Sequence, residues 1–187
     1  AWVEHRRADC RAIQDELAAT DPADARPARE LARHLCELYR FAEALEFGAE
    51  AVERDPADAE AWTQHARALA NTGREEQARG AFERAIELSA GRQNAWRHNT
   101  AMVLERMAEQ YVVEQGPGEL SYAWQPAAGG VLATYLEPFY AQARAELAER
   151  YGFTPEAVRI EVFGRHQDFS VRSTGFEGFP ALGVCFG

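Results

Sequence analysis

Lysine is absent from this sequence, so all twenty of its basic residues are arginines. This excludes chemistry that needs a lysine amine, both a Schiff base and the phosphate-binding loop that ends in Gly-Lys. A G-x-S-x-G nucleophile motif is missing as well. Cysteine is scarce: Cys10, Cys36 and Cys185 include no C-x-x-C pair, which argues against a disulfide framework and a zinc knuckle. We expect these cysteines to be reduced, buried thiols.

Long apolar runs are missing too. No stretch approaches the ~18 apolar residues that a membrane-spanning helix needs, and no charged and then apolar leader stands at the start. The sequence therefore predicts a soluble chain without a membrane span, and it indicates no particular compartment. Because it opens on Ala1 and stops at Gly187 directly after an apolar run, we expect both ends to continue in a longer protein.

Acidic residues exceed basic ones by thirty to twenty, which gives a net charge of −10. A sequence-independent grip on nucleic-acid phosphates is therefore not expected, and a protein or peptide is the predicted partner. Ala, Glu and Arg are dense in the first hundred residues, whereas Val and Ile are rare there. These preferences favour helices over strands in that part of the chain.

A spacing of 34 residues recurs through this helical part. Pro22 and Pro56 lie 34 residues apart, and each follows Asp and precedes Ala-Asp. The same shift relates Ala28 to Trp62 and Trp96, Ala32 to Ala66, Leu35 to Leu69, Ala44 to Ala78, and Ala51 to Ala85. A period between about 20 and 50 residues is typical of repeat architectures, in which each unit stacks on the next.

The positions that recur have the volumes found in tetratricopeptide (TPR) repeats: a large residue early in the first helix, small residues between helices, and a closing proline. The chain resembles that family over about residues 1 to 105. In the best unit, Gly73 lies in the turn, where a left-handed residue costs least. In the preceding unit Gly48 stands at the position of Phe82, so we expect either a cavity or a closer approach of helices there.

The resemblance implies a mainly α fold, a TPR-type solenoid of helical hairpins over residues 1–110. Residues 1–20 are expected to be the last helix of an earlier unit, with Ile13 and Leu17 on one face. After Trp96 the pattern decays, so the third unit is expected to be incomplete and its first helix to form a junction. A small, incomplete α+β segment is expected over residues 111–187.

In this segment the periodicity changes from 3.6 to 2 residues. Tyr111 and Val113, and then Leu120, Tyr122 and Trp124, alternate with other residues on either side of Gly116-Pro117-Gly118, which predicts a hairpin.

A helix over about residues 131–150 follows, and Pro138 should kink it or begin a second helix. Leu132, Leu136, Phe139, Tyr140, Ala143 and Leu147 are predicted to share one face of it. Gly152 is expected to close the helix. Strands are predicted at 159–163 and 182–186, too few for a finished sheet.

Several words in this segment resemble the opening of peptidase MA-like domains, which are similar to gluzincin zinc metallopeptidases. They are Tyr151-Gly152-Phe153-Thr154-Pro155, Ile160-Glu161-Val162-Phe163, His166-Gln167-Asp168-Phe169-Ser170-Val171-Arg172 and Gly183-Val184-Cys185-Phe186-Gly187. In that family an H-E-x-x-H helix supplies two zinc-binding imidazoles and the glutamate that deprotonates the attacking water. No such motif occurs in this chain.

We therefore nominate no catalytic residue, metal ligand or cofactor in this chain, and zinc is expected only in a longer parent protein. The five histidines are isolated, with no pair four residues apart. His166 and Asp168 stand on a polar turn after a strand, where active sites often gather. The structural interpretation is favoured instead, with Asp168 capping a short helix and His166 solvated.

A ligand-binding face is predicted from the repeat register, because the first helices of TPR units line the concave surface of the superhelix. The inward positions are Arg26, Arg29, Arg33, Thr63, Arg67, Asn71, Asn94 and Arg97. Guanidinium groups suit carboxylates, so one interpretation is a groove for an anionic peptide. The other is that the arginines pair with Glu30, Glu37 or Glu60 and keep the helices solvated.

Two functions remain open. The chain is either a protein interaction scaffold, whose repeats recruit a partner, or the non-catalytic front part of a zinc metallopeptidase whose H-E-x-x-H helix lies beyond residue 187. Whether the parent protein is an enzyme is left undecided by these residues. An unfinished sheet also leaves a strand edge, at Leu182 to Phe186, where copies of the chain can pair into oligomers.

Overall fold

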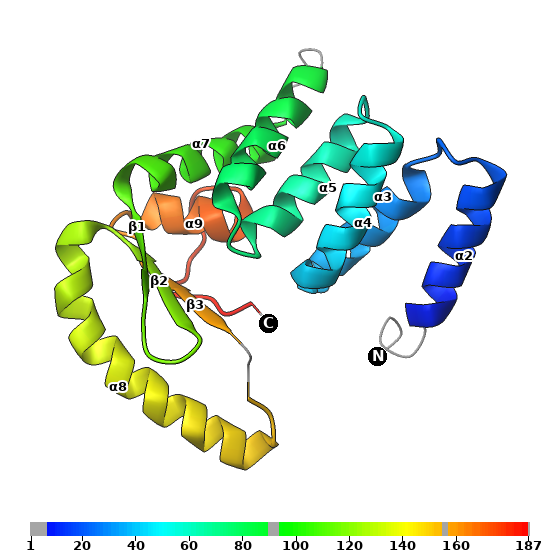
Figure 1. The fold of residues 1–187 in the computed structure, drawn as a ribbon. Helices are drawn as coiled ribbons and strands as arrows, with labels where there is room; N and C mark the ends of the chain where they lie inside the picture. Colours follow the sequence, from blue (N-terminus) through cyan, green and yellow to red (C-terminus); the bar gives the residue numbers. More distant parts are fainter. Residues whose placement is uncertain (1–6, 90–93, 155–156, 187) are drawn as a thin grey trace. The chain divides into compact units, whose positions relative to one another are not determined.

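The computed structural model describes residues 7–89, 94–154 and 157–186. Over these residues the chain is mainly helical, with a small three-stranded sheet (Figure 1). It divides into two compact units, the first holding residues up to Leu104 together with 183–187, and the second Glu105–Leu182. Helix α7 (Ala95–Gln110) runs across this division and ends at the boundary predicted from the sequence.

Helices of 12 or 14 residues make up the described part of the first unit before α7. They are α2 (Arg7–Thr20), α3 (Arg26–Glu37), α4 (Phe41–Arg54), α5 (Ala59–Ala70) and α6 (Glu75–Leu88). Neighbouring helices from α3 to α6 pack together, and α3 also contacts α5. Asp58 begins α5, because its carboxylate accepts the backbone N–H groups of Glu60 and Ala61 at 2.8 and 3.2 Å. Such a cap stabilises a helix by about 1 kcal/mol.

The 34-residue spacing recurs in the backbone. Helices α4 and α6 begin at Phe41 and Glu75 and have the same length. Each turn before them closes with the same hydrogen bond, from Arg40 N–H to the Leu35 carbonyl at 2.9 Å and from Arg74 N–H to the Leu69 carbonyl at 3.1 Å. Within these turns Tyr39 has φ 60° and Gly73 has φ 75°. The expected left-handed glycine is therefore present in one unit, and a tyrosine takes the same conformation in the other.

Small residues fill the seams between these helices. The fully buried alanines at repeat positions are Ala32, Ala44, Ala51, Ala66, Ala78 and Ala85. Phe82 is also fully buried, and its ring meets that of Trp96 edge-on at 5.6 Å between centroids. At the position equivalent to Phe82, a Cβ added to Gly48 would lie 2.9 Å from the Cα of His65. The glycine therefore allows a close approach of α4 to α5, as one of the two expectations required.

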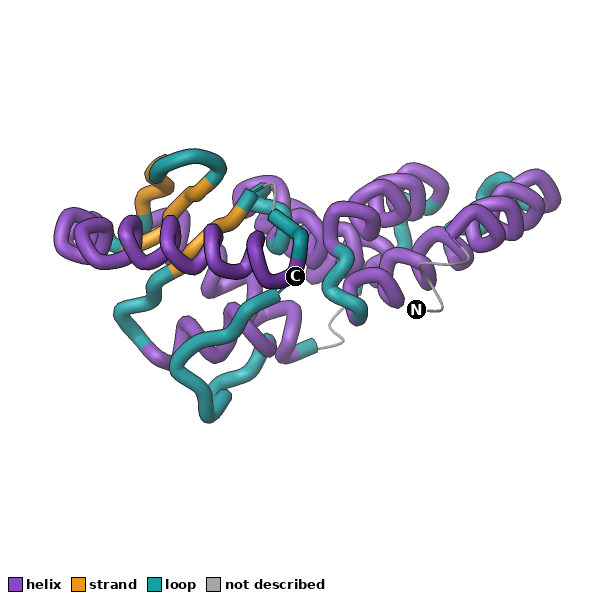
Figure 2. Tube along the Cα trace, turned by 90° about the horizontal axis from the view of Figure 1, so that it is seen from below, coloured by secondary structure: helices purple, strands orange, loops and turns teal. Residues whose placement is uncertain are grey.

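The second unit contains β1 (Val112–Gln115), β2 (Leu120–Trp124), α8 (Pro126–Tyr151), β3 (Val158–Glu161) and α9 (His166–Thr174). The sheet order is β1-β2-β3, with β1 antiparallel to β2 and β2 parallel to β3. Helix α8 is the crossover between the parallel strands and lies along the sheet (Figures 1 and 2). Leu120, Tyr122 and Trp124 are buried on the face that it covers.

The predicted hairpin and strand are confirmed, with differences in detail. Val112 rather than Val113 packs on the core of the sheet, and Val113 is 57% exposed. Helix α8 continues through Pro138 as a single helix that curves in Figure 1, and Gly152 ends it at φ 64°. Leu132, Leu136 and Tyr140 pack inward as expected, but Phe139 and Leu147 are exposed.

The strand predicted at 182–186 is wrong, since these residues have no strand pairing and Leu182 is 96% exposed. Alternating apolar residues need an adjacent strand edge to form a ladder. Here the Phe186 ring stacks on that of Tyr39 at 5.2 Å instead. The expected burial of cysteines holds for Cys36 but is wrong for Cys185, which is exposed, and the side chain of Cys10 lies outside the described residues.

Candidate functional site

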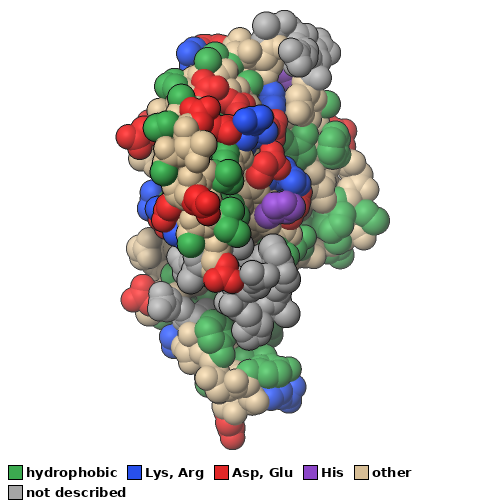
Figure 3. Space-filling model, turned by 90° about the vertical axis from the view of Figure 1, so that its right-hand side faces the viewer, with side chains coloured by type: hydrophobic (Ala, Val, Ile, Leu, Met, Phe, Trp, Pro, Cys, Tyr) green, Lys and Arg blue, Asp and Glu red, His purple; other side chains and the backbone are tan. Residues whose placement is uncertain are grey.

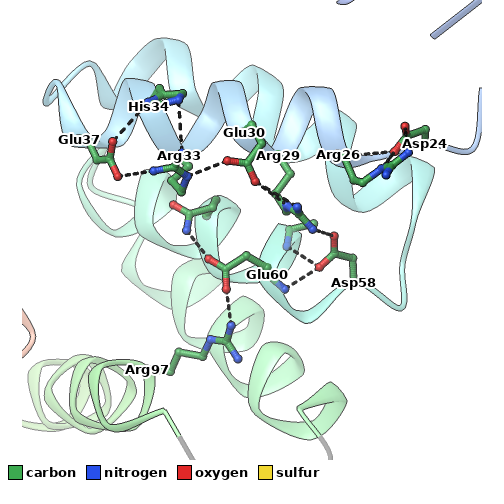
Figure 4. Close-up of polar contacts among 12 residues, drawn as sticks. Asp24, Arg26, Arg29, Glu30, Arg33, His34, Glu37, Asp58, Glu60 and Arg97 are labelled. Atoms are coloured by element: carbon green, nitrogen blue, oxygen red, sulfur yellow. Dashed lines mark hydrogen bonds and ion pairs between the residues drawn. The ribbon is translucent and has the colours of Figure 1, made fainter. Parts of the chain in front are cut away.

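The three arginines predicted on α3 lie along one side of that helix, and each is bound to a carboxylate (Figure 4). Arg26 Nε lies 2.8 Å from Asp24 Oδ1. Arg29 Nη1 reaches Asp58 Oδ2, at the start of α5, at 2.8 Å.

Arg33 joins two acids of its own helix. Its Nε lies 2.8 Å from Glu30 and its Nη1 lies 2.7 Å from Glu37. The arginine face of α3 is therefore already a row of alternating charges.

These pairs stay ionised at neutral pH. The hydrogen bond from the Arg26 side chain, with the backbone N–H of the same residue, lowers the pKa of Asp24 to about 2. The hydrogen bond from Arg33 is the main cause that lowers the pKa of Glu30. The Arg26 side chain is 74% exposed and that of Arg33 is 35% exposed, so both pairs are open to solvent. Exposed pairs of this kind contribute about 0.2–1 kcal/mol each.

The predicted residues of α5 are used by the fold itself. Thr63 is buried, and its hydroxyl donates to the Ala59 carbonyl at 2.7 Å. Arg67 Nη2 donates to the carbonyl of Cys36, which joins α5 to α3. Asn71 follows α5 and donates from Nδ2 to the Arg67 carbonyl at 2.9 Å.

The two predicted residues at the start of α7 are also bound within the molecule. Asn94 precedes the helix, and its Oδ1 accepts the backbone N–H of Arg97 at 3.2 Å, as an N-cap does. Arg97 is buried, with Nη2 at 2.5 Å from Glu60 of α5 and Nη1 at 2.6 Å from Ser89 Oγ. Arg97 therefore ties α7 to α5, and Figure 4 shows Glu60 between Gln64 and Arg97.

The predicted set thus separates into two groups. Arg26, Arg29 and Arg33 come together on α3, whereas Thr63, Arg67, Asn71, Asn94 and Arg97 serve mainly as links within and between helices. The predicted pairing of arginines with Glu30, Glu37 and Glu60 is present. Asp24 and Asp58 are partners that the sequence reasoning missed, although their 34-residue spacing was visible. Acidic and basic side chains also lie intermixed on the face shown in Figure 3.

A shallow groove of about 660 Å³ lies beside Gly48, among helices α4, α5 and α6. It is lined by Leu45, Ala49, Trp62, His65, Leu69, Arg74, Gln77, Gly80, Ala81 and Arg84. Burial, followed by the charge of Arg74, lowers the pKa of His65. The neutral imidazole is therefore favoured, and its Nδ1 is buried without a hydrogen-bond partner among the described residues.

In the second unit, the interpretation of Asp168 as a helix cap is wrong. Arg165 occupies the N-cap position of α9, and Asp168 is buried in the first turn, where it pairs with Arg106. A carboxylate at this depth needs a cation, which explains why it does not cap the helix. His166 is exposed, as expected, with Nε2 at 2.9 Å from the Ala181 carbonyl.

No group of three or more His, Cys, Asp or Glu side chains in the described residues is arranged to hold a metal ion. Among the helices described, none combines the length and the apolarity needed to cross a membrane. No protein-family model matches the chain, and no curated protein matches it either.

Proposed function

We propose that the first unit is a TPR-type interaction scaffold that binds an acidic segment of a protein partner along α3. The repeat assignment is supported by the equal helices α4 and α6 and by the matching turns at Tyr39 and Gly73. The observation that carries the binding site is the row of solvent-open ion pairs at Arg26 and Arg33.

Exchange of partners makes such a row suitable for binding. A carboxylate of the partner replaces Asp24 on Arg26, or Glu30 or Glu37 on Arg33, and the displaced acid returns to water. Because each exposed pair is weak, this exchange needs little free energy, and several exchanges in one segment add up. Arg67 and Arg97 are less suited, since the fold already uses them between helices.

A calorimetric titration tests this proposal with a short acetylated peptide of alternating Glu and Gly, and with its Gln counterpart as the charge control. We expect weak binding of the Glu peptide that falls as salt rises from about 20 to about 200 mM. Arg26→Ala with Arg33→Ala should reduce the affinity roughly tenfold. Arg84→Ala is the matched control, because Arg84 forms an equally exposed pair with Glu87 on α6.

Equal binding of the Glu and Gln peptides, or equal binding by the double variant, would contradict the proposal. So would the same loss of affinity in Arg84→Ala, because a general effect of net charge would then explain the result.

The alternative proposal is that the chain is the non-catalytic front part of a zinc metallopeptidase, whose repeats deliver a substrate. It is supported by the quoted words of the second unit, two of which form β3 and α9. The sequence of the parent protein beyond Gly187 tests it. A helix with H-E-x-x-H there supports the peptidase, and its absence leaves the scaffold.

A further inference from the structure

Helix α8 is much longer than the sheet that it covers. Its 26 residues extend over about 39 Å, whereas strands of 4 or 5 residues extend over about 17 Å. Leu132, Leu136 and Tyr140 pack on the sheet. Beyond them Leu147 and Tyr151 are 50% and 69% exposed. The C-terminal half of the helix therefore carries apolar side chains that no described residue covers.

These side chains belong to a continuous row. Residues at every fourth position of α8 form one ridge on its surface, and the row here is Val131, Tyr135, Phe139, Ala143, Leu147 and Tyr151. Tyr135 and Phe139 are about as exposed as Tyr151, at 72% and 70%. A helix that is apolar on the opposite side as well is typical of one that is covered on both sides.

We propose that this row is a self-association surface, on which α8 of a second copy packs antiparallel about a twofold axis near residue 141. Ridges of every fourth residue interlock when two helices cross at about −50°. Antiparallel packing about that axis places Phe139 opposite Ala143 and Tyr135 opposite Leu147. A large ring then faces the smallest residue of the row at the crossing point, which allows close packing.

Charge favours a second copy over other partners. Glu137 and Arg144 flank the middle of the row, and neither forms an ion pair within the described residues. About the same axis, Glu137 of one copy lies within one residue of the position opposite Arg144 of the other, so each interface has two complementary pairs. Glu146 and Glu149 lie on the same half of the helix, and the net charge is −10, which disfavours an anionic lipid surface.

The surface is small, because a single pair of crossing helices buries less than the ~1,200 Å² of a standard interface. The dimer is therefore weak and depends on concentration. Sedimentation velocity of the full chain from about 5 to about 200 µM tests it. We expect the sedimentation coefficient to rise toward that of a dimer over this range.

Phe139→Glu should raise the dissociation constant at least tenfold, since it places a charge at the crossing point. Phe153→Glu is the matched control: this phenylalanine is 68% exposed but lies outside the row, and dimerisation should persist. Glu137→Arg should weaken association, and adding Arg144→Glu to it should restore association, which distinguishes paired contacts from general stickiness.

A monomer at every concentration would overturn the proposal. A dimer that survives Phe139→Glu would also overturn it and would point to pairing of strand edges, and loss of association in both phenylalanine variants would indicate unspecific aggregation.

Discussion

Gly48 and His65 face each other where α4 meets α5, so closely that a Cβ on residue 48 would lie 2.9 Å from the His65 Cα. The next unit has Phe82 at the position of Gly48, and there the helices are held apart by a ring that packs on Trp96. Two neighbouring seams of one repeat array are therefore built in opposite ways, one by close backbone approach and one by an aromatic side chain.

Gly48→Ala should destabilise the protein by about 1–3 kcal/mol. Alanine favours a helix by up to about 1 kcal/mol over glycine, but here its Cβ meets the backbone of His65, which cannot move without shifting α5. Gly80→Ala is the matched control, because Gly80 lies inside α6 with no atom within 4 Å of an added Cβ. It should stabilise by about 0.5–1 kcal/mol. Urea unfolding measures both, and equal stabilisation by the two substitutions would contradict the close approach.

Asp168→Asn should destabilise the protein by about 1–3 kcal/mol. The carboxylate is 4% exposed and pairs with Arg106, so an amide leaves the cation without its counter-charge. Glu37→Gln removes an exposed partner of Arg33 and should change stability by less than about 1 kcal/mol. The difference between the two variants in urea is the measurement. A loss as small as that of Glu37→Gln would show that the Asp168 pair does not hold α9 to α7.

Acidification should weaken the fold through His65. Its folded pKa lies below the ordinary 6.5, because burial and then the charge of Arg74 disfavour the imidazolium. As the pH falls below 6.5, the unfolded chain takes up this proton first, so the contribution of His65 to stability is lost in that direction. The carboxylates Asp24 and Glu30 titrate at lower pH. His65→Leu should flatten the decrease in urea midpoint between about pH 7 and 5.5, and an unchanged decrease would contradict the assignment.

The Cys36 thiol should be inert in the folded protein. Burial raises its pKa to about 11, so almost none of it is the reactive thiolate at neutral pH. Cys185 is exposed. In a Cys10→Ser background, Ellman's reagent at about pH 8 should label one thiol rapidly and the second only on unfolding. Rapid labelling of two thiols would show that the α3–α4 core is open.

The repeat part was predictable because packing recurs. A helix seam imposes a volume at each contact, so Ala44, Ala78 and Phe82 could be placed by the 34-residue shift without knowing the structure. Tyr39 was harder, because glycine is the usual signal for a left-handed turn residue and this unit has none there.

The second unit shows where local patterns stop being sufficient. Residues 182–186 have strand-like alternation, but a strand exists only where another strand supplies hydrogen bonds, and the sequence does not show whether it does. Phe139 follows the helical period of a buried face yet is exposed, because the covering sheet is shorter than α8. Burial of this kind depends on the size of a neighbouring element.

The candidate site was predictable in its positions but not in its pairing. The register placed Arg29 and Arg97 at equivalent points of the repeat. It did not show that Arg29 would reach forward to Asp58 while Arg97 reaches back to Glu60. Long side chains have many rotamers, and their partners lie on other helices, so only the packed arrangement decides which carboxylate each one binds.

The nesting of helix pairs 34 residues apart is the claim on which the proposed scaffold rests, and a nuclear Overhauser spectrum tests it most directly. We predict a cross-peak between the Hα protons of Gly48 and His65, together with cross-peaks between the rings of Phe82 and Trp96. Absence of the Gly48 to His65 cross-peak in a spectrum that resolves both residues would contradict the account.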